Sequence, residues 1–170
     1  TATPIPRTLA MTAYGDLDVS IIDELPPNRK PIKTSHIYDK HIKQVFEFIY
    51  SELQKNKQVY IVYPLIEESK VLDYKNLMEG YENIKAIFQT KGFDISMIHG
   101  RLKKEEKEYQ MNKFLNKKTH IMVSTTVIEV GVNVPDAAIM VINNAEKFGL
   151  SQLHQLRGRV GRSSYQSHCF

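Results

Sequence analysis

The stretch QVYIVYPLI, residues 58–66, is a continuous run of mostly apolar residues that is rich in β-branched side chains. It is too short to cross a bilayer, and unbroken runs of this kind are typical of strands covered on both faces of a parallel sheet. Two similar runs follow at HIMVSTT (120–126) and AAIMVINN (137–144). The stretch therefore predicts a central strand of an α/β fold.

Helical periodicity separates these apolar runs. We expect Asp39 to cap a helix, because apolar residues recur after it at helical spacing. They are Ile42, Val45, Phe46, Ile49 and Leu53. A second helix is marked by Leu77, Tyr81, Ile84 and Phe88, and a third by Met111, Phe114 and Leu115. With further strands expected at 32–38 and 93–100, the alternation predicts right-handed crossovers and a mainly parallel sheet flanked by helices.

Composition places the chain among globular proteins. Its 170 residues carry a net charge of +4, with a pI near 9.0, which is compatible with a nucleic-acid partner without indicating one. No apolar run reaches the roughly 20 residues that a membrane-spanning helix needs, so no membrane association is expected. One cysteine, Cys169, excludes an internal disulfide and suits a reducing cytoplasm. The opening TATPIPRTLA lacks an initiator Met, so we expect a piece of a longer protein.

Prolines mark the expected domain boundary. In ELPPNRKP, residues 24–31, three prolines prevent a helix from continuing and predict an extended connector. We therefore separate residues 1–30 from a main domain at 31–170.

Ligands of parallel α/β sheets bind outside the carboxyl ends of the strands. The residues that follow the predicted strands are Pro64, His99 with Gly100, Thr125 with Thr126, and Asn143 with Asn144. These positions are the first place to expect binding side chains.

Familiar nucleotide and metal motifs are missing from the sequence. No G-x-x-x-x-G-K-[ST] loop occurs, because none of the eight glycines is followed by lysine. Asp23 and Glu24 in SIIDEL imitate a magnesium-binding pair, but without a preceding phosphate loop we interpret them as a strand end. The six histidines are scattered, so metal bound by this chain alone is not expected.

The stretch LSQLHQLRGRVGR, residues 150–162, carries three arginines and no acid. A helix capped by Ser151 would place three polar side chains on one face, namely Gln155, Arg159 and Arg162. Gly158 and Gly161 would each cost such a helix about 1 kcal/mol, which indicates close approach of another group. Guanidinium groups suit phosphate oxygens, although a basic helix face is often only solvated.

Three motifs in this chain resemble those of superfamily 2 helicases. QLRGRVGR (155–162) matches the Q-x-x-G-R-x-x-R of motif VI, TATPIPRTL (1–9) resembles motif III, and STTVIEVGVNVP (124–135) resembles motif V. Within the superfamily the chain is similar to the RecG family of branched-DNA helicases. That similarity rests on TAYGDLDVSIIDELPPNRKPI, VYPLIEES, MIHGRL, VIEVGVNVPDA and EKFGLSQLHQLRGRVGR. Transcription-repair coupling factors share part of the pattern and are the alternative.

The resemblance implies a RecA-like fold and a division of labour between two lobes. Residues 1–30 would be the tail of the first lobe with its connector, and 31–170 the second lobe. ATP would bind between the lobes, with the phosphate loop and Mg²⁺ ligands on the first lobe. Arg159 and Arg162 would reach the γ-phosphate, Gln155 would support them, and Gly131 would contact the nucleotide. The fragment alone is then expected to be inactive.

The resemblance also implies partners. These are branched duplex DNA such as forks and Holliday junctions, and the first lobe and a wedge domain of the same polypeptide, in the bacterial cytoplasm with the nucleoid. DNA-backbone contacts are expected from His99, Gly100, Arg101, Thr125 and Thr126, and coupling between ATP and DNA from Thr1 and Thr3.

Three interpretations stay open. Thr126 and Glu129 also fit a capping box, which would explain them without any ligand. Asn133 stands where motif V commonly has an aspartate, so a nucleotide contact there is in doubt. A DNA-binding module without catalysis is the alternative from a different class.

Overall fold

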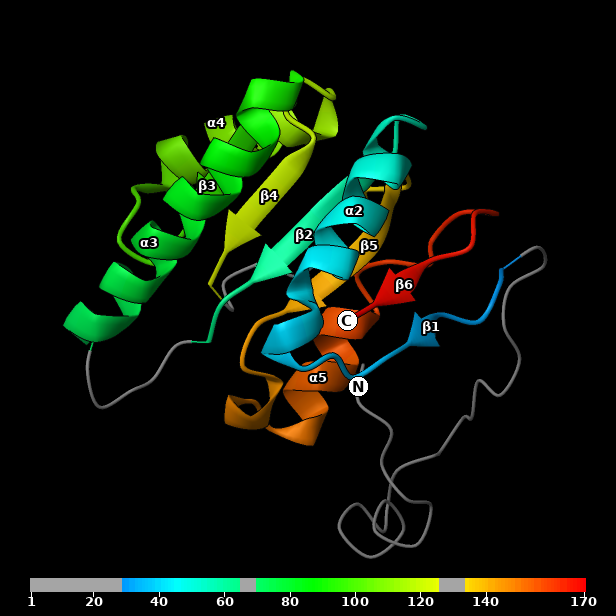
Figure 1. The fold of residues 1–170 in the computed structure, drawn as a ribbon. Helices are drawn as coiled ribbons and strands as arrows, with labels where there is room; N and C mark the ends of the chain where they lie inside the picture. The colour runs from blue at the N-terminus through cyan, green and yellow to red at the C-terminus, as the bar shows by residue number, and fades with distance from the viewer. Residues whose placement is uncertain (1–28, 65–69, 126–133) are drawn as a thin grey trace, which may run out of the picture.

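The computed structural model describes residues 29–64, 70–125 and 134–170, which form a six-stranded sheet with every strand pair parallel (Figure 1). The strands are β1 (Lys33–Thr34), β2 (Gln58–Val62), β3 (Ile95–Ile98), β4 (Ile121–Ser124), β5 (Ala137–Ile142) and β6 (His168–Cys169). Their order across the sheet is β1-β6-β5-β2-β4-β3. The predicted fold class is thereby confirmed.

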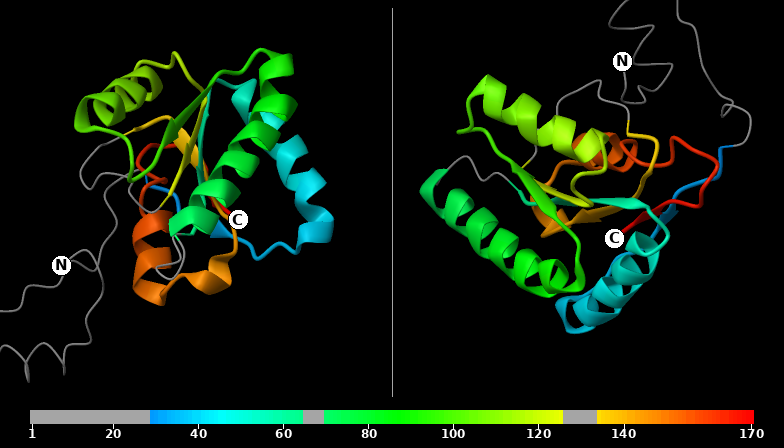
Figure 2. Two further views of the ribbon diagram at one scale, coloured as in Figure 1. Left: turned by 90° about the vertical axis from the view of Figure 1, so that its left-hand side faces the viewer. Right: turned by 90° about the horizontal axis from the view of Figure 1, so that it is seen from above.

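Helices cover both faces of the sheet. They are α2 (Ile42–Leu53), α3 (Lys70–Phe88), α4 (Lys104–Leu115) and α5 (Leu150–Arg157), with short 3-10 turns η1 (Asp39–His41), η2 (Gln89–Lys91) and η3 (Ala145–Lys147). The view from above separates α2 and α3 on one face from α4 and α5 on the other (Figure 2). This three-layer arrangement is expected when parallel strands are joined by helical crossovers.

The central strand β2 contributes to two hydrophobic cores. Val59 and Ile61 pack with α2 and α3, whereas Tyr60 and Val62 pack with α4 and α5. All four side chains are buried, since successive residues of a strand point to opposite faces. The prediction of a central strand within residues 58–66 is confirmed, although the strand ends at Val62.

Several local predictions differ from the structure. The strand expected at 32–38 is reduced to Lys33–Thr34, and the two-residue β6 beside it was not predicted. Asp39 lies inside η1, and the N-cap position of α2 is taken by His41 instead of Asp39. Leu115 is partly exposed, while Met111 and Phe114 carry the buried face of α4.

Among the described residues, no helix combines the length and the apolar character that a membrane crossing requires.

Candidate functional site

Two predicted DNA-contact residues meet at the carboxyl ends of neighbouring strands. His99 follows β3 and Thr125 follows β4, and the Thr125 backbone N–H donates to the carbonyl of Ile98 at 3.3 Å. Only 7% of His99 and 3% of Thr125 is exposed. Because the strands fix their backbones, these two side chains are held at one edge of the sheet, as the parallel topology predicted.

This edge carries buried polar atoms that lack partners in the described part of the chain. They are Nδ1 of His99, Oγ of Ser124 and Oγ1 of Thr125. Buried polar groups are normally hydrogen-bonded, so each such atom calls for an explanation such as a ligand. Burial, aided by the charges of Arg101 and Lys107, lowers the pKa of His99, which favours its neutral ring. We name His99, Thr125 and Arg101 the strand-end site.

Tyr74 of α3, which sequence reasoning missed, organises the strand-end site. Its ring packs edge-on against His99 with centroids 5.2 Å apart, and the guanidinium carbon of Arg101 lies 4.5 Å from the same ring centroid. Gly100 between them is exposed, and a Cβ there would meet no atom within 4 Å. Tyr74 stands three residues before Leu77, at helical spacing, so extending that periodic face would have found it.

The arginine-rich stretch is not one continuous helix. Helix α5 begins after Gly149, whose N–H donates to Oε1 of Gln152 at 3.1 Å, and it ends at Arg157. Ser151 is therefore not the cap. Gln155 lies on the exposed side of α5, whereas Arg159 and Arg162 follow the helix, so the predicted shared helical face is wrong.

Beyond Gly158, the C-cap of α5, the backbone turns into a left-handed conformation at Gly161. This glycine has φ of +75°, which side-chain-bearing residues rarely adopt, and an added Cβ would lie 2.8 Å from Cγ1 of Ile32. The close approach that the glycines indicated is therefore made, at Gly161, by the Ile32 side chain. Gly158 instead caps α5 with ordinary helical angles.

Arg159 and Arg29 both lie within electrostatic reach of Arg162. Burial and the charges of Arg159 and Arg29 lower the pKa of Arg162, while Tyr60 opposes that shift. Burial raises the pKa of Tyr60 to about 12 despite Arg159 and Arg162. No salt bridge joins any of the three arginines to a carboxylate in the described residues. We name Arg29, Arg159 and Arg162 the arginine cluster; Arg29 was missed because it follows the connector prolines.

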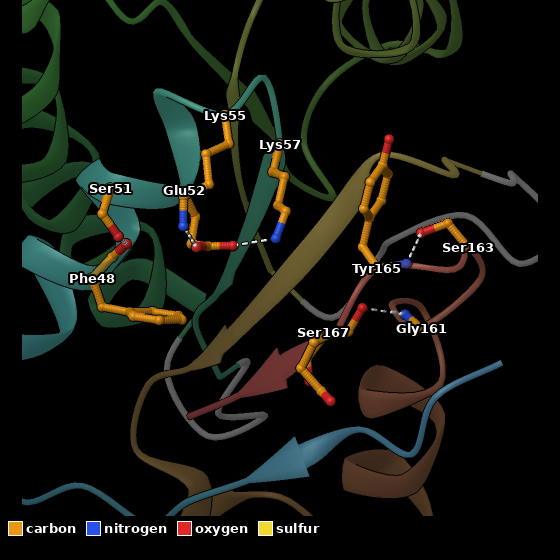
Figure 3. Close-up of polar contacts among 10 residues, drawn as sticks. Phe48, Ser51, Glu52, Lys55, Lys57, Gly161, Ser163, Tyr165 and Ser167 are labelled. Atoms are coloured by element: carbon orange, nitrogen blue, oxygen red, sulfur yellow. Dashed lines mark hydrogen bonds and ion pairs between the residues drawn. The ribbon is translucent and has the colours of Figure 1, made fainter. Parts of the chain in front are cut away.

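The segment 158–167, named here the arginine loop, lies at the opposite edge from the strand-end site. It leads directly into β6, so it stands at the amino ends of the parallel strands. Arg162 folds back within it, its Nε donating to the carbonyl of Gly158 at 3.3 Å. A second bond closes the loop from the Gly161 N–H to Oγ of Ser167 at 3.1 Å (Figure 3).

Several predicted residues lie outside the described ones. They are Thr1, Thr3, Thr126, Gly131 and Asn133, together with most of the proposed segment 1–30. Within the described ranges, no group of three or more His, Cys, Asp or Glu residues could hold a metal ion. The roles of the predicted residues that lie outside the described ranges stay predictions.

The comparisons with known proteins agree with this architecture. A family profile described as the helicase conserved C-terminal domain matches residues 40–164. ATP-dependent DNA helicase RecG from Synechocystis sp. is 59% identical over 170 residues, covering 99% of this chain and 20% of the relative. The same-named protein from Streptococcus pneumoniae is 55% identical over 168 residues, covering 99% and 25%.

Solved structures give the same match. A structure of RecG bound to a three-way DNA junction is 47% identical with a TM-score of 0.80, covering 99% of this chain and 21% of that one. Domain 2 of the DEAD-box helicase Mss116p, 20% identical with a TM-score of 0.57, covers 76% of this chain and 45% of that one, and shares the fold. The predicted resemblance to RecG is confirmed. The chain spans a fifth to a quarter of the length of these curated relatives.

Proposed function

Since the chain belongs to the helicase conserved C-terminal domain family, we propose that it is the second RecA-like motor lobe of an ATP-dependent DNA helicase acting on branched DNA. The lobe comprises residues 31–170, and 1–30 belong to the tail of the first lobe and its connector. The full-length protein hydrolyses ATP to migrate branches and regress stalled forks in recombination and repair. The RecG relatives named above support this assignment over a transcription-repair coupling factor.

The arginine cluster is the observation that carries the proposal. Arg162 feels the positive charges of Arg159 and Arg29, and none of the three is paired with a carboxylate in the described residues, so an anion beside Arg162 would be stabilised. A triphosphate held by the first lobe supplies that anion, with Arg159 and Arg162 at the γ-phosphate. Arginines so placed accelerate phosphoryl transfer by about 10³ to 10⁵. Gln155, next to them along the chain, supports the site.

The described residues fit the anionic end of the nucleotide rather than its metal. Mg²⁺ would supply counter-charge to the β- and γ-phosphates when bound, and its ligands are assigned to the first lobe. Gly131 remains the expected nucleotide contact in motif V.

The strand-end site is assigned to the DNA backbone. His99, Thr125 and the cation of Arg101 lie at one edge, and buried polar atoms of His99 and Thr125 have no partner among the described residues. Contacts to phosphate oxygens carry no sequence information and weaken with salt, as suits an enzyme that reads branch shape. Gly100 and Thr126 are assigned to the same DNA contact, and Thr1 and Thr3 of motif III to relaying the state of the ATP cleft. The wedge domain and first lobe are partners within the polypeptide, which acts in the bacterial cytoplasm.

Substitutions in the full-length protein test the function. Arg159→Ala and Arg162→Ala should each reduce ATP turnover on a three-way junction by at least about 100-fold, while junction affinity changes less than about twofold. Arg157→Ala is the matched control, because its guanidinium contacts His154 at 3.5 Å and is outside the arginine cluster. Turnover near the wild-type level in both cluster variants would contradict the motor assignment and favour a non-catalytic module.

A further inference from the structure

The arginine loop needs something other than a helix to hold it. Catalytic groups must be held within roughly 0.5 Å of their productive geometry, which requires supporting contacts from rigid elements. The bond between Gly161 and Ser167 closes one end of the loop, and Ser167 is fully buried. Its carbonyl also accepts the N–H of Lys33, so this end is tied to β1.

A buried ion pair stands beside the other side of the loop. Glu52 of α2 is 5% exposed and accepts hydrogen bonds from Lys57, at the start of β2, and from Lys55 at 2.6 Å. Burial alone would raise the pKa of Glu52, but the two ammonium groups outweigh it and the pKa is lowered. The bond to Glu52 fixes the position of the Lys57 ammonium group between α2 and the central strand β2.

Lys57 also contacts the arginine loop. Its Nζ lies 5.5 Å from the centroid of the Tyr165 ring, within the range of a cation–π interaction. Figure 3 shows Lys57 between Glu52 and Tyr165. The Tyr165 N–H donates to Oγ of Ser163 at 3.4 Å, and Ser163 directly follows Arg162. The cation therefore touches the loop three residues from a member of the arginine cluster.

We propose that Lys57 and Tyr165 form a clamp that fixes the arginine loop, which makes Tyr165 a positioning residue for ATP hydrolysis. The inference rests on the proposed function, because it assigns the loop's arginines to the γ-phosphate. The aromatic face of Tyr165 carries the effect, since its ring is what Lys57 contacts. Lys57 itself is less suited to substitution, because its loss leaves Glu52 buried with one ammonium fewer.

The test measures ATP turnover of the full-length protein on a three-way junction. Tyr165→Leu should lower kcat about three- to tenfold with a smaller change in KM, while Tyr165→Phe, which keeps the ring, stays within about twofold. In an Arg162→Ala background, Tyr165→Leu should add no further loss, because it acts through the arginine. A purely structural role would instead lower turnover by the same factor in both backgrounds.

The outcomes separate the clamp from the proposed function. Wild-type kcat in Tyr165→Leu together with a large loss in Arg162→Ala overturns the clamp and leaves the motor lobe standing. Equal losses in the Leu and Phe variants also overturn it, because the hydroxyl and not the ring would then act. Full turnover in both Arg159→Ala and Arg162→Ala removes the proposed function itself.

Discussion

The two edges of the sheet are built in different ways. At the strand-end site, His99 and Thr125 follow strands directly, so backbone ladders fix them. At the other edge, the arginine loop depends on one glycine conformation and a few side-chain contacts. The comparison teaches that strand pairing fixes the edge at the strand-end site, whereas particular side-chain contacts hold the edge at the arginine loop.

The strongest test of this comparison is whether a substitution at each edge impairs a different activity, ATP turnover at one and junction binding at the other. In the full-length protein, Arg162→Ala should remove at least about 99% of junction-stimulated ATP turnover and leave junction affinity within twofold. Thr125→Val should do the reverse, weakening junction binding about three- to tenfold while DNA-free turnover is retained. Steady-state kinetics and fluorescence anisotropy measure the two effects. If both variants lose the same property, the two edges do not have separate tasks.

Alanine substitutions of one glycine at each edge compare how well the two backbones accept a Cβ atom. Gly161→Ala forces a Cβ onto Ile32 at a positive φ, so the free energy of unfolding should fall by about 1–3 kcal/mol. Gly100→Ala enters open space and should change it by less than about 0.5 kcal/mol. Urea unfolding of the 170-residue chain measures both. Equal stabilities of the two variants would refute the strain assigned to Gly161.

Substitutions of Tyr74 test whether the strand-end site, like the arginine loop, depends on a supporting side chain. Tyr74→Leu removes the ring that contacts His99 and Arg101, so junction affinity should fall about two- to fivefold. Tyr74→Phe keeps the ring and should bind like the wild type. Titrations at several salt concentrations provide the measurement, and an unchanged affinity in the Leu variant would mean that the strands alone suffice.

The smallest expected effect is on the pH dependence of stability. Burial lowers the folded pKa of His99 and of His168 below the usual 6.5. The unfolded chain therefore binds more protons below that pH, and stability present at pH 7.5 is lost as pH falls through the folded pKa values. His99→Gln should lose less stability than wild type between pH 7.5 and 5.0 in urea unfolding. Identical losses would exclude His99 as a contributor.

The sheet could be predicted because its signals are local. β2, β4 and β5 are apolar runs whose burial on both faces follows from their composition. The path of the chain after α5 could not be predicted, because the contact of Gly161 with Ile32 joins residues that are distant in sequence. A two-residue strand such as β6 has too few residues for a pattern.

The residues of the candidate site also divide into those that the sequence predicted and those that it did not. His99 and Thr125 were found because strand ends of a parallel sheet share an edge. Arg29 was not found, since its electrostatic contact with Arg162 is tertiary and no spacing encodes it. Tyr74 was missed because the periodic helix face marked by Leu77 was not extended toward the start of α3.

The incoming chain touches the arginine loop before it joins the sheet. Nε2 of Gln166 donates to the carbonyl of Pro31 at 2.8 Å, and Ile32 lies against Gly161. Gly161 directly precedes Arg162, so the residues that enter β1 and the backbone beside this arginine are held together by side-chain contacts.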